Sequence, residues 1–150
     1  MALSDSDGAA ELEISEDNTG DNRLFVDSSE NAFNENARAK IAIRTSRLDT
    51  LLPDLRPHDC IIWMDVQGYE GKVLSGAPAA LAARPPIVAE FWPYGMRRAG
   101  TYELLRDALA HYGRFCVLDG RGQWRPIGEL DALRDSISGL DHVDILALPA

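Results

Sequence analysis

The stretch that decides the fold reads Ile61-Ile-Trp-Met-Asp65-Val-Gln-Gly68-Tyr-Glu70-Gly-Lys-Val-Leu74-Ser-Gly-Ala77. With residues 59 and 60 it begins as a continuous run of mainly apolar side chains, which is typical of a strand buried on both faces. Asp65 ends the run, and residues 69–74 have the composition of a helix. The stretch therefore predicts a buried strand at 59–64, a polar turn and a helix in succession.

The same alternation of strand and helix continues to the C-terminus. The predicted elements are strands at 87–91, 114–118 and 143–148, helices at 46–52, 78–83, 101–112 and 127–137, and a loop at 93–100. Strands that alternate with helices form a mostly parallel sheet joined by right-handed crossovers. We therefore expect an α/β fold with such a sheet and flanking helices.

The first part of the chain has a different pattern. Residues 10–14 and 37–44 alternate apolar and polar side chains, which is typical of half-exposed strands. Leu12 and Ile14 are expected to face inward, and residues 27–36 predict a mobile loop because they contain few apolar side chains. We interpret 1–150 as a single domain with two parts. Residues 1–44 form an acidic strand and loop segment resembling a β-hairpin insertion, and 45–150 form the alternating portion.

The net charge of −9 lies entirely in the first quarter of the chain. Residues 1–36 contain ten acidic residues and one basic residue, so the rest of the chain is neutral. This distribution argues against nucleic-acid binding, which needs clustered Lys and Arg, and against attraction to an anionic membrane surface. We interpret the acidic segment as a solvated flank outside the functional site.

The sequence also predicts a cytoplasmic location. Cys60 and Cys116 lie in apolar runs and are expected to be reduced, buried side chains. No apolar stretch approaches the ~20 residues that a membrane span needs. No basic segment followed by an apolar run begins the sequence, so no secretory leader is predicted.

Several motifs resemble those of the FkbM-type methyltransferase family, in the same order and spacing. They are Leu-Asp-x-Leu-Leu at 48–52, Asp-Val-Gln-Gly at 65–68, Glu-x-x-Val-Leu-x-Gly-Ala at 70–77, the opening at 2–8 and Val-Ala-Glu-Phe at 88–91. Trp63 stands where many members have Lys, and Gln67 where Glu is commoner, which we interpret as marks of a subgroup. The resemblance implies a partial Rossmann-like class I methyltransferase fold that uses S-adenosylmethionine.

One feature of such folds is missing from the sequence. In the related methyltransferases a Gly-rich turn after the first strand lets the backbone approach the cofactor, and no such turn precedes the first strand here. We therefore expect the chain to be the C-terminal portion of a domain truncated at its N-terminus, with weak or undetectable binding of S-adenosylmethionine on its own. Sheet edges left by missing strands would favour a homodimer or pairing with a separate N-terminal half.

Asp65 and Glu90 are the predicted catalytic residues. Asp65, at the end of a buried strand, could orient an acceptor hydroxyl, take its proton or face the cationic cofactor; the alternative is a helix cap or a hydrogen bond to the turn. Glu90 ends an apolar strand, where burial can raise its pKa and suit it to acid–base work. The alternative for Glu90 is an ion pair with Arg97 or Arg98.

The remaining predicted site residues come from the resemblance and from the strand ends. Ser4 and Asp5 resemble the family's segment beside the adenine of the cofactor, with turn formation as the alternative. Gln67, Trp92 and Tyr94 are expected to bind the acceptor, with loop packing as the alternative for the two aromatic residues. Glu70 is expected to stabilise its helix through the helix dipole. No cluster has metal-ligand spacing.

The predicted function is O-methylation of a hydroxyl on a sugar or other small metabolite, with S-adenosylmethionine as the methyl donor. The expected partner is this small hydroxyl-bearing acceptor, with no nucleic acid and no membrane. The alternative is a catalytically inactive remnant, or an interaction module that dimerises or pairs with a separate N-terminal half.

Overall fold

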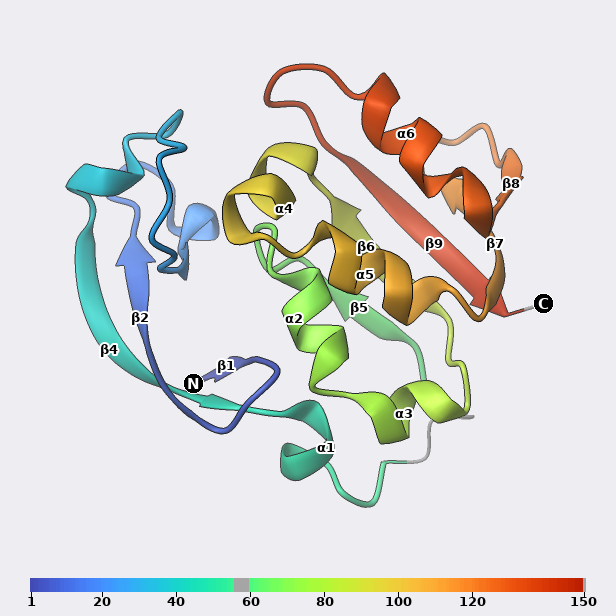
Figure 1. Ribbon diagram of the computed structural model, residues 1–150, viewed down its shortest axis with the longest axis horizontal. Coiled ribbons are helices and arrows are strands. Elements are labelled where there is room, and N and C mark those ends of the chain that lie inside the picture. Colours follow the sequence, from blue (N-terminus) through green and yellow to red (C-terminus); the bar gives the residue numbers. More distant parts are fainter. Residues whose placement is uncertain (56–59, 150) are drawn as a thin grey trace.

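The computed structural model describes residues 1–55 and 60–149, and these form two separate β-sheets with helices between and beside them (Figure 1). The first sheet has the strand order β1-β4-β2-β3. Its strands are β1 (Ala2–Leu3), β4 (Ala39–Ser46), β2 (Gly8–Ile14) and β3 (Arg23–Leu24). The pair β1–β4 is parallel, while β2 runs antiparallel to both β4 and β3.

The second sheet has five strands in the order β5-β6-β9-β7-β8. They are β5 (Ile62–Met64), β6 (Ile87–Phe91), β9 (Val143–Pro149), β7 (Tyr112–Val117) and β8 (Trp124–Pro126). Strand β8, which the sequence pattern did not predict, pairs with β7. The predicted strand at 59–64 begins at Ile62 among the described residues, and Asp59 lies outside them.

The prediction of a mostly parallel sheet is wrong. Only β5–β6 is parallel within the second sheet as described, while β6–β9, β7–β9 and β7–β8 are antiparallel. The physical reason lies in the connections. A short turn joins β7 to β8, and β9 lies between β6 and β7 and runs antiparallel to both, so β7 follows two helices without becoming a parallel neighbour of β6.

The helices follow the predicted positions except at one place. They are α1 (Leu48–Leu51), α2 (Glu70–Ser75), α3 (Pro78–Ala82), α4 (Pro93–Ala99), α5 (Tyr102–Leu109) and α6 (Leu130–Ser136), with short 3₁₀ turns at Thr19–Asp21, Glu35–Ala37 and Ile127–Glu129. The predicted loop at 93–100 is helix α4. Pro93 occupies its first turn and Gly100 closes it in the left-handed conformation, with φ of +65°, so both boundary signals were present in the sequence.

The main core lies between the helices and one face of the second sheet. Ile87, Ala89 and Phe91 of β6 are fully buried there and pack with apolar side chains of α2, α4, α5 and α6. Strand β5 is the edge of this sheet, and its Trp63 side chain is 72% exposed. The helices therefore pack against one apolar face of the second sheet. The outer edge of β5 has no neighbouring strand among the described residues.

The acidic segment does not form a solvated flank, because several of its carboxylates are buried in ion pairs. Glu13 of β2 is 1% exposed and accepts a hydrogen bond of 2.7 Å from Arg98 of α4. Glu35 is fully buried, lies 3.3 Å from Arg23 and accepts a hydrogen bond from Tyr94. We call these five residues the buried ion network. It attaches the first sheet and its loops to α4.

The network also reverses the predicted facing of β2. Leu12 and Ile14, expected to face inward, are only half-buried, whereas Glu13 between them is buried. The apolar alternation predicted the strand correctly but assigned the wrong face, because the partner of Glu13 lies 85 residues away. Residues 27–36, predicted as a mobile loop, likewise contain the buried Glu35.

The substitution Arg98→Met should lower the free energy of unfolding by ~3–5 kcal/mol, because Glu13 and Glu35 would lose a buried cationic partner. Urea denaturation of the purified chain measures this difference. Arg121→Met is the control. Arg121 is 79% exposed, and its ion pair with Asp119 is long, at 3.6 Å. Its replacement should therefore change the free energy of unfolding by no more than ~0.5 kcal/mol. Equal effects of the two substitutions would contradict a structural role for the network.

Candidate functional site

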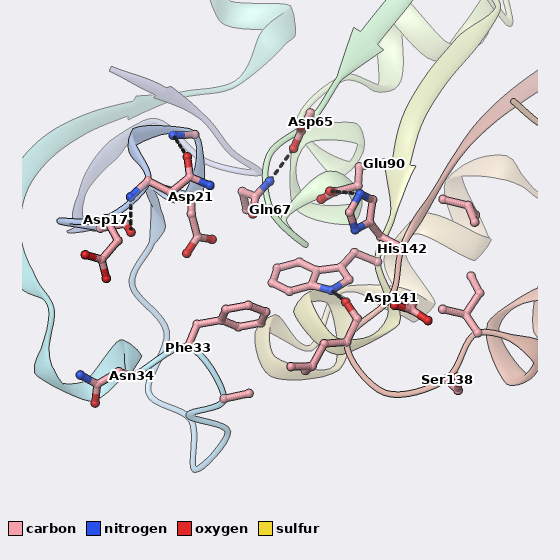
Figure 2. A pocket seen from close by; sticks show the side chains of 18 of the residues that line it. Asp17, Asp21, Phe33, Asn34, Asp65, Gln67, Glu90, Ser138, Asp141 and His142 are labelled. Atoms are coloured by element: carbon pink, nitrogen blue, oxygen red, sulfur yellow. Dashed lines mark hydrogen bonds and ion pairs between the residues drawn. The ribbon is translucent and has the colours of Figure 1, made fainter. Parts of the chain in front are cut away.

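A cleft of about 1240 Å³ lies between the loops of the acidic segment and the ends of β5 and β6 (Figure 2). The segment before β9 closes a third side. The residues that line the cleft include Ser15, Asp17, Asn18, Asp21, Phe33, Asn34, Arg38, Asp65, Gln67, Glu90, Trp92, Ser138, Leu140, Asp141 and His142. Four of the predicted site residues, Asp65, Gln67, Glu90 and Trp92, thus come together at one cavity.

Asp65 projects from the turn that follows β5. Its Oδ1 accepts a hydrogen bond of 2.8 Å from Gln67 Nε2, so these two predicted residues face each other in the cleft (Figure 2). The helix α2 has no side-chain cap, so the capping alternative for Asp65 does not apply. Instead Glu70 Oε1 accepts the Val66 N–H at 3.0 Å and supports the turn.

The turn itself needs an unusual backbone. Gln67 and Gly68 have φ of +56° and +89°, in the left-handed region that glycine adopts readily. A Cβ at residue 68 would lie 2.3 Å from the carbonyl carbon of Gly95, so only glycine fits against α4. The Gly68 carbonyl also accepts a hydrogen bond of 2.5 Å from the Thr101 hydroxyl. The turn is thereby fixed against the helices.

Glu90 reaches the cleft from β6 and is 6% exposed. Burial, together with the nearby carboxylates of Asp65, Glu70 and Asp144, raises the pKa of Glu90 to about 8. Its Oε2 has no hydrogen-bond partner among the described residues. His142 Nε2 lies 3.8 Å from its Oε1. Glu90 therefore holds a proton near neutral pH.

The alternative that Glu90 pairs with Arg97 or Arg98 is wrong. Arg97 binds Glu30 at 2.7 Å, and Arg98 binds Glu13. Both arginines of α4 point toward the acidic segment.

Glu70 is a second carboxyl with a shifted pKa. It is fully buried, and burial raises its pKa to about 7, against the opposing effect of backbone hydrogen bonds that include the Val66 N–H. The predicted dipole role understates this residue, because its side chain turns back onto the strand-end turn.

Trp92 and Tyr94 have different places. Trp92 lines the cleft, and its indole Nε1 donates a hydrogen bond of 3.0 Å to the Leu140 carbonyl. Tyr94 is 2% exposed and does not line the cleft; its hydroxyl donates to Glu35 at 2.8 Å. The Phe33 ring packs edge-on against both, with centroids 5.6 Å apart in each case. Tyr94 thus supports the aromatic wall from behind.

Ser4 and Asp5, the predicted cofactor residues, do not line the cleft. Asp5 accepts hydrogen bonds from Lys72 at 2.6 Å and from the Ser4 hydroxyl at 3.0 Å. The structure therefore shows an ion pair between the N-terminal segment and α2 at this position. It separates Ser4 and Asp5 from Asp65, the third predicted cofactor residue.

Sequence reasoning missed most residues of the cleft, among them Asp17, Phe33, Asp141 and His142. These four lie on loops that are distant in sequence from the ends of β5 and β6. The position of His142 beside Glu90 follows from the antiparallel pairing of β9 with β6. No local pattern in the sequence shows that these loops meet at the cleft.

Comparison with protein families gives a match over three quarters of the chain. The model of the methyltransferase FkbM domain matches residues 1–114. The chain belongs to the FkbM methyltransferase family. Comparisons with curated proteins and with solved structures found no match.

Within this FkbM methyltransferase domain, Asp65, Gln67 and Glu90 fall inside the matched range, whereas Asp141 and His142 lie beyond it. The residues described in the structure contain no group of three or more His, Cys, Asp or Glu side chains arranged to hold a metal ion. Among the same residues, no helix is long and apolar enough to cross a membrane.

The family implies S-adenosylmethionine as cofactor, but the described residues do not by themselves fit that molecule. Asp5 is already bound by Lys72, and only Asp65 of the three predicted cofactor residues faces the cleft. Gly68 packs against Gly95 and offers no open backbone to a ligand. We therefore assign no cofactor cradle among the described residues, and the cleft is a candidate site for the acceptor.

The substitution Glu90→Gln should flatten the pH dependence of stability between about pH 4.5 and pH 8. Because the folded state holds the Glu90 proton that the unfolded chain releases, the free energy of unfolding should fall as pH rises through this window. One such group changes the free energy of unfolding by at most ~1.4 kcal/mol for each pH unit. Urea denaturation at several pH values measures the slope in both proteins.

The control for this measurement is Glu103→Gln on α5, where the carboxylate is 61% exposed. This substitution should leave the slope between pH 4.5 and pH 8 unchanged. A slope that is the same in wild type and Glu90→Gln would contradict a raised pKa for Glu90.

Proposed function

We propose that this chain takes part in S-adenosylmethionine-dependent O-methylation and that its cleft binds the acceptor, a hydroxyl-bearing sugar or other small metabolite. The observation that carries the proposal is the meeting of Asp65 and Glu90 at one cleft, at the ends of the adjacent strands β5 and β6. Family membership supports methyl transfer as the reaction type.

The two carboxyl groups suit different roles. Methyl transfer to a hydroxyl releases a proton, so the site needs a base beside the acceptor oxygen. Asp65 is the proposed base, because its only hydrogen-bond partner among the described side chains is the neutral amide of Gln67. Glu90 keeps its proton near neutral pH and can donate a hydrogen bond that orients the acceptor. Gln67 and Trp92 complete the acceptor site.

A second candidate function is favoured by the edge of the second sheet. Trp63 is 72% exposed and Ile61 is 52% exposed beside the strand β5, which lacks a neighbour on one side in the described residues. Apolar strand edges of this kind tend to pair with another chain. In this alternative the chain is a non-catalytic module that forms a homodimer or pairs with a separate N-terminal half.

The remaining proposals concern the environment of the protein. Cys116 is a buried thiol outside any disulfide, which supports the proposed cytoplasmic location. We propose no nucleic-acid or membrane partner. The acidic segment has a negative net charge, and acidic side chains also line the cleft, so both would repel phosphate groups.

Two measurements test the proposed function. Calorimetry with S-adenosylmethionine should show weak or undetectable binding, because the described residues form no cofactor cradle; micromolar affinity would contradict this expectation. Methyl transfer from labelled S-adenosylmethionine at high concentration to methyl glucoside should be slow in the wild type. It should fall ~100-fold or more in Asp65→Asn, the size of a general-base contribution.

The outcomes separate the two candidates. Binding of methyl glucoside without any transfer, together with a dimer in sedimentation experiments, would favour the non-catalytic module. Transfer that is unchanged in Asp65→Asn would contradict the role of Asp65 as base. Asp119→Asn, at a turn outside the cleft, is the matched control and should leave both binding and transfer unchanged.

A further inference from the structure

The cleft carries an excess of negative charge that no side chain of the described residues neutralises. Asp17, Asp65 and Asp141 all line it, and none of them has a cationic partner in residues 1–55 and 60–149. Figure 2 shows Asp17 and Asp21 on one side of the cavity and Asp65, Glu90 and Asp141 on the other. A ligand in this cleft therefore lies between carboxylates from several separate segments.

Of the basic residues along the described part of the cleft, Arg38 is already held by a carboxylate. Arg38 is bound to the Asp21 carboxylate and to the Asp21 carbonyl, the latter at 2.8 Å. His142 lies beside Glu90, with 3.8 Å between Nε2 and Oε1. A phosphate or carboxylate group on a ligand would meet no arginine or lysine of the described cleft that lacks a carboxylate partner, and it would be repelled by the acids.

Glu90 gives an independent sign that a polar ligand group belongs in the cleft. Its side chain is 8% exposed, yet Oε2 has no partner among the described residues. A buried polar atom without a hydrogen bond costs free energy, so unpaired atoms of this kind mark places where a ligand or water supplies the missing bond. Glu90 and Asp65 both line the cleft, where the proposed acceptor hydroxyl would bind.

The aromatic wall adds a face for the apolar side of such a ligand. Phe33 is 37% exposed at the cleft and is held edge-on by Trp92. Aromatic faces also attract cations, since their electron density is negative above the ring. Arg23 already lies over both rings, 5.5 Å from the centroid of Phe33 and 4.9 Å from that of Trp92, so the wall suits the apolar face of a ring-shaped polyol and the charge preference comes from the carboxylates.

We propose that the cleft selects an acceptor with a protonated amine next to its hydroxyl groups, as in an amino sugar, and rejects acceptors with a phosphate or carboxylate. This inference rests on the proposed function of the cleft as an acceptor site. The hydroxyl binds between Asp65 and Glu90, and the combined negative charge of the cleft, to which Asp17 and Asp141 contribute from opposite sides, attracts the ammonium group.

Ligand-observed NMR titration of the full chain with glucosamine, glucose and glucuronate tests the inference. At low salt and below neutral pH, where the glucosamine amine is protonated, glucosamine should bind about tenfold more tightly than glucose, equivalent to one decade in Kd. Glucuronate should show no detectable binding. The preference for glucosamine should shrink at high salt, because ions screen charges in an open cleft.

Substitutions in the cleft test whether its carboxylates cause the preference for glucosamine over glucose. Asp17→Asn and Asp141→Asn should each bring the affinity for glucosamine closer to that for glucose, while the affinity for glucose stays the same. Asp119→Asn changes the net charge by the same amount at a turn outside the cleft and should leave the preference intact.

Each result decides between distinct conclusions. Binding of glucose without a preference for glucosamine, or binding of glucuronate as tight as that of glucosamine, would overturn the inference and leave the proposed acceptor site standing. A preference that persists in Asp17→Asn and Asp141→Asn would also overturn it, because the charge would then act elsewhere. Failure of all three sugars to bind would count against the inference and the proposed function together.

Discussion

The arrangement of this protein depends on the ion pair between Arg98 of α4 and Glu13 of β2, together with Glu35 beside it. The longest strand of the first sheet, β4, buries little of its apolar surface. Ile41 of β4 is 50% exposed, and β4 is exposed along most of its length. Buried charges are costly to desolvate and are tolerated only when paired. The pairing of Glu13 and Glu35 with arginines therefore fixes where the acidic segment can lie.

The same network shapes the cleft. Glu35 accepts hydrogen bonds from the Phe33 N–H at 2.8 Å and from the Tyr94 hydroxyl, and these bonds hold the Phe33 ring at the cavity. The Arg23 guanidinium lies 4.9 Å from the ring centroid of Trp92 and so contacts the aromatic wall from the other side. An interaction that reads as purely structural thus determines one wall of the candidate site. The chemistry of the opposite wall depends on the turn between β5 and α2.

That turn and its neighbour β6 bring the exposed Asp65 close to two buried carboxyl groups, Glu70 and Glu90. Asp65, Glu70 and Glu90 repel one another, and burial raises the pKa of Glu70 to about 7 and of Glu90 to about 8. Carboxyl groups in such a setting lose protons at different pH values, which allows one to accept a proton while another donates a hydrogen bond. This division of roles matches what transfer to a hydroxyl requires and agrees with membership of the FkbM methyltransferase family.

The sequence by itself determined the local elements and the central motif. The apolar run before Asp65, the helix from Glu70 and the buried strand ending near Glu90 were all predicted, because short-range patterns of side chains set them. The tertiary structure alone decided the strand directions in the second sheet, the buried face of β2 and the separation of Asp5 from the cleft. It also brought Asp17, Phe33, Asp141 and His142 to the cavity. The physical reason is the same in each case: these features depend on partners distant in sequence, such as Arg98 for Glu13, and no local periodicity records which distant charge or strand will be the neighbour.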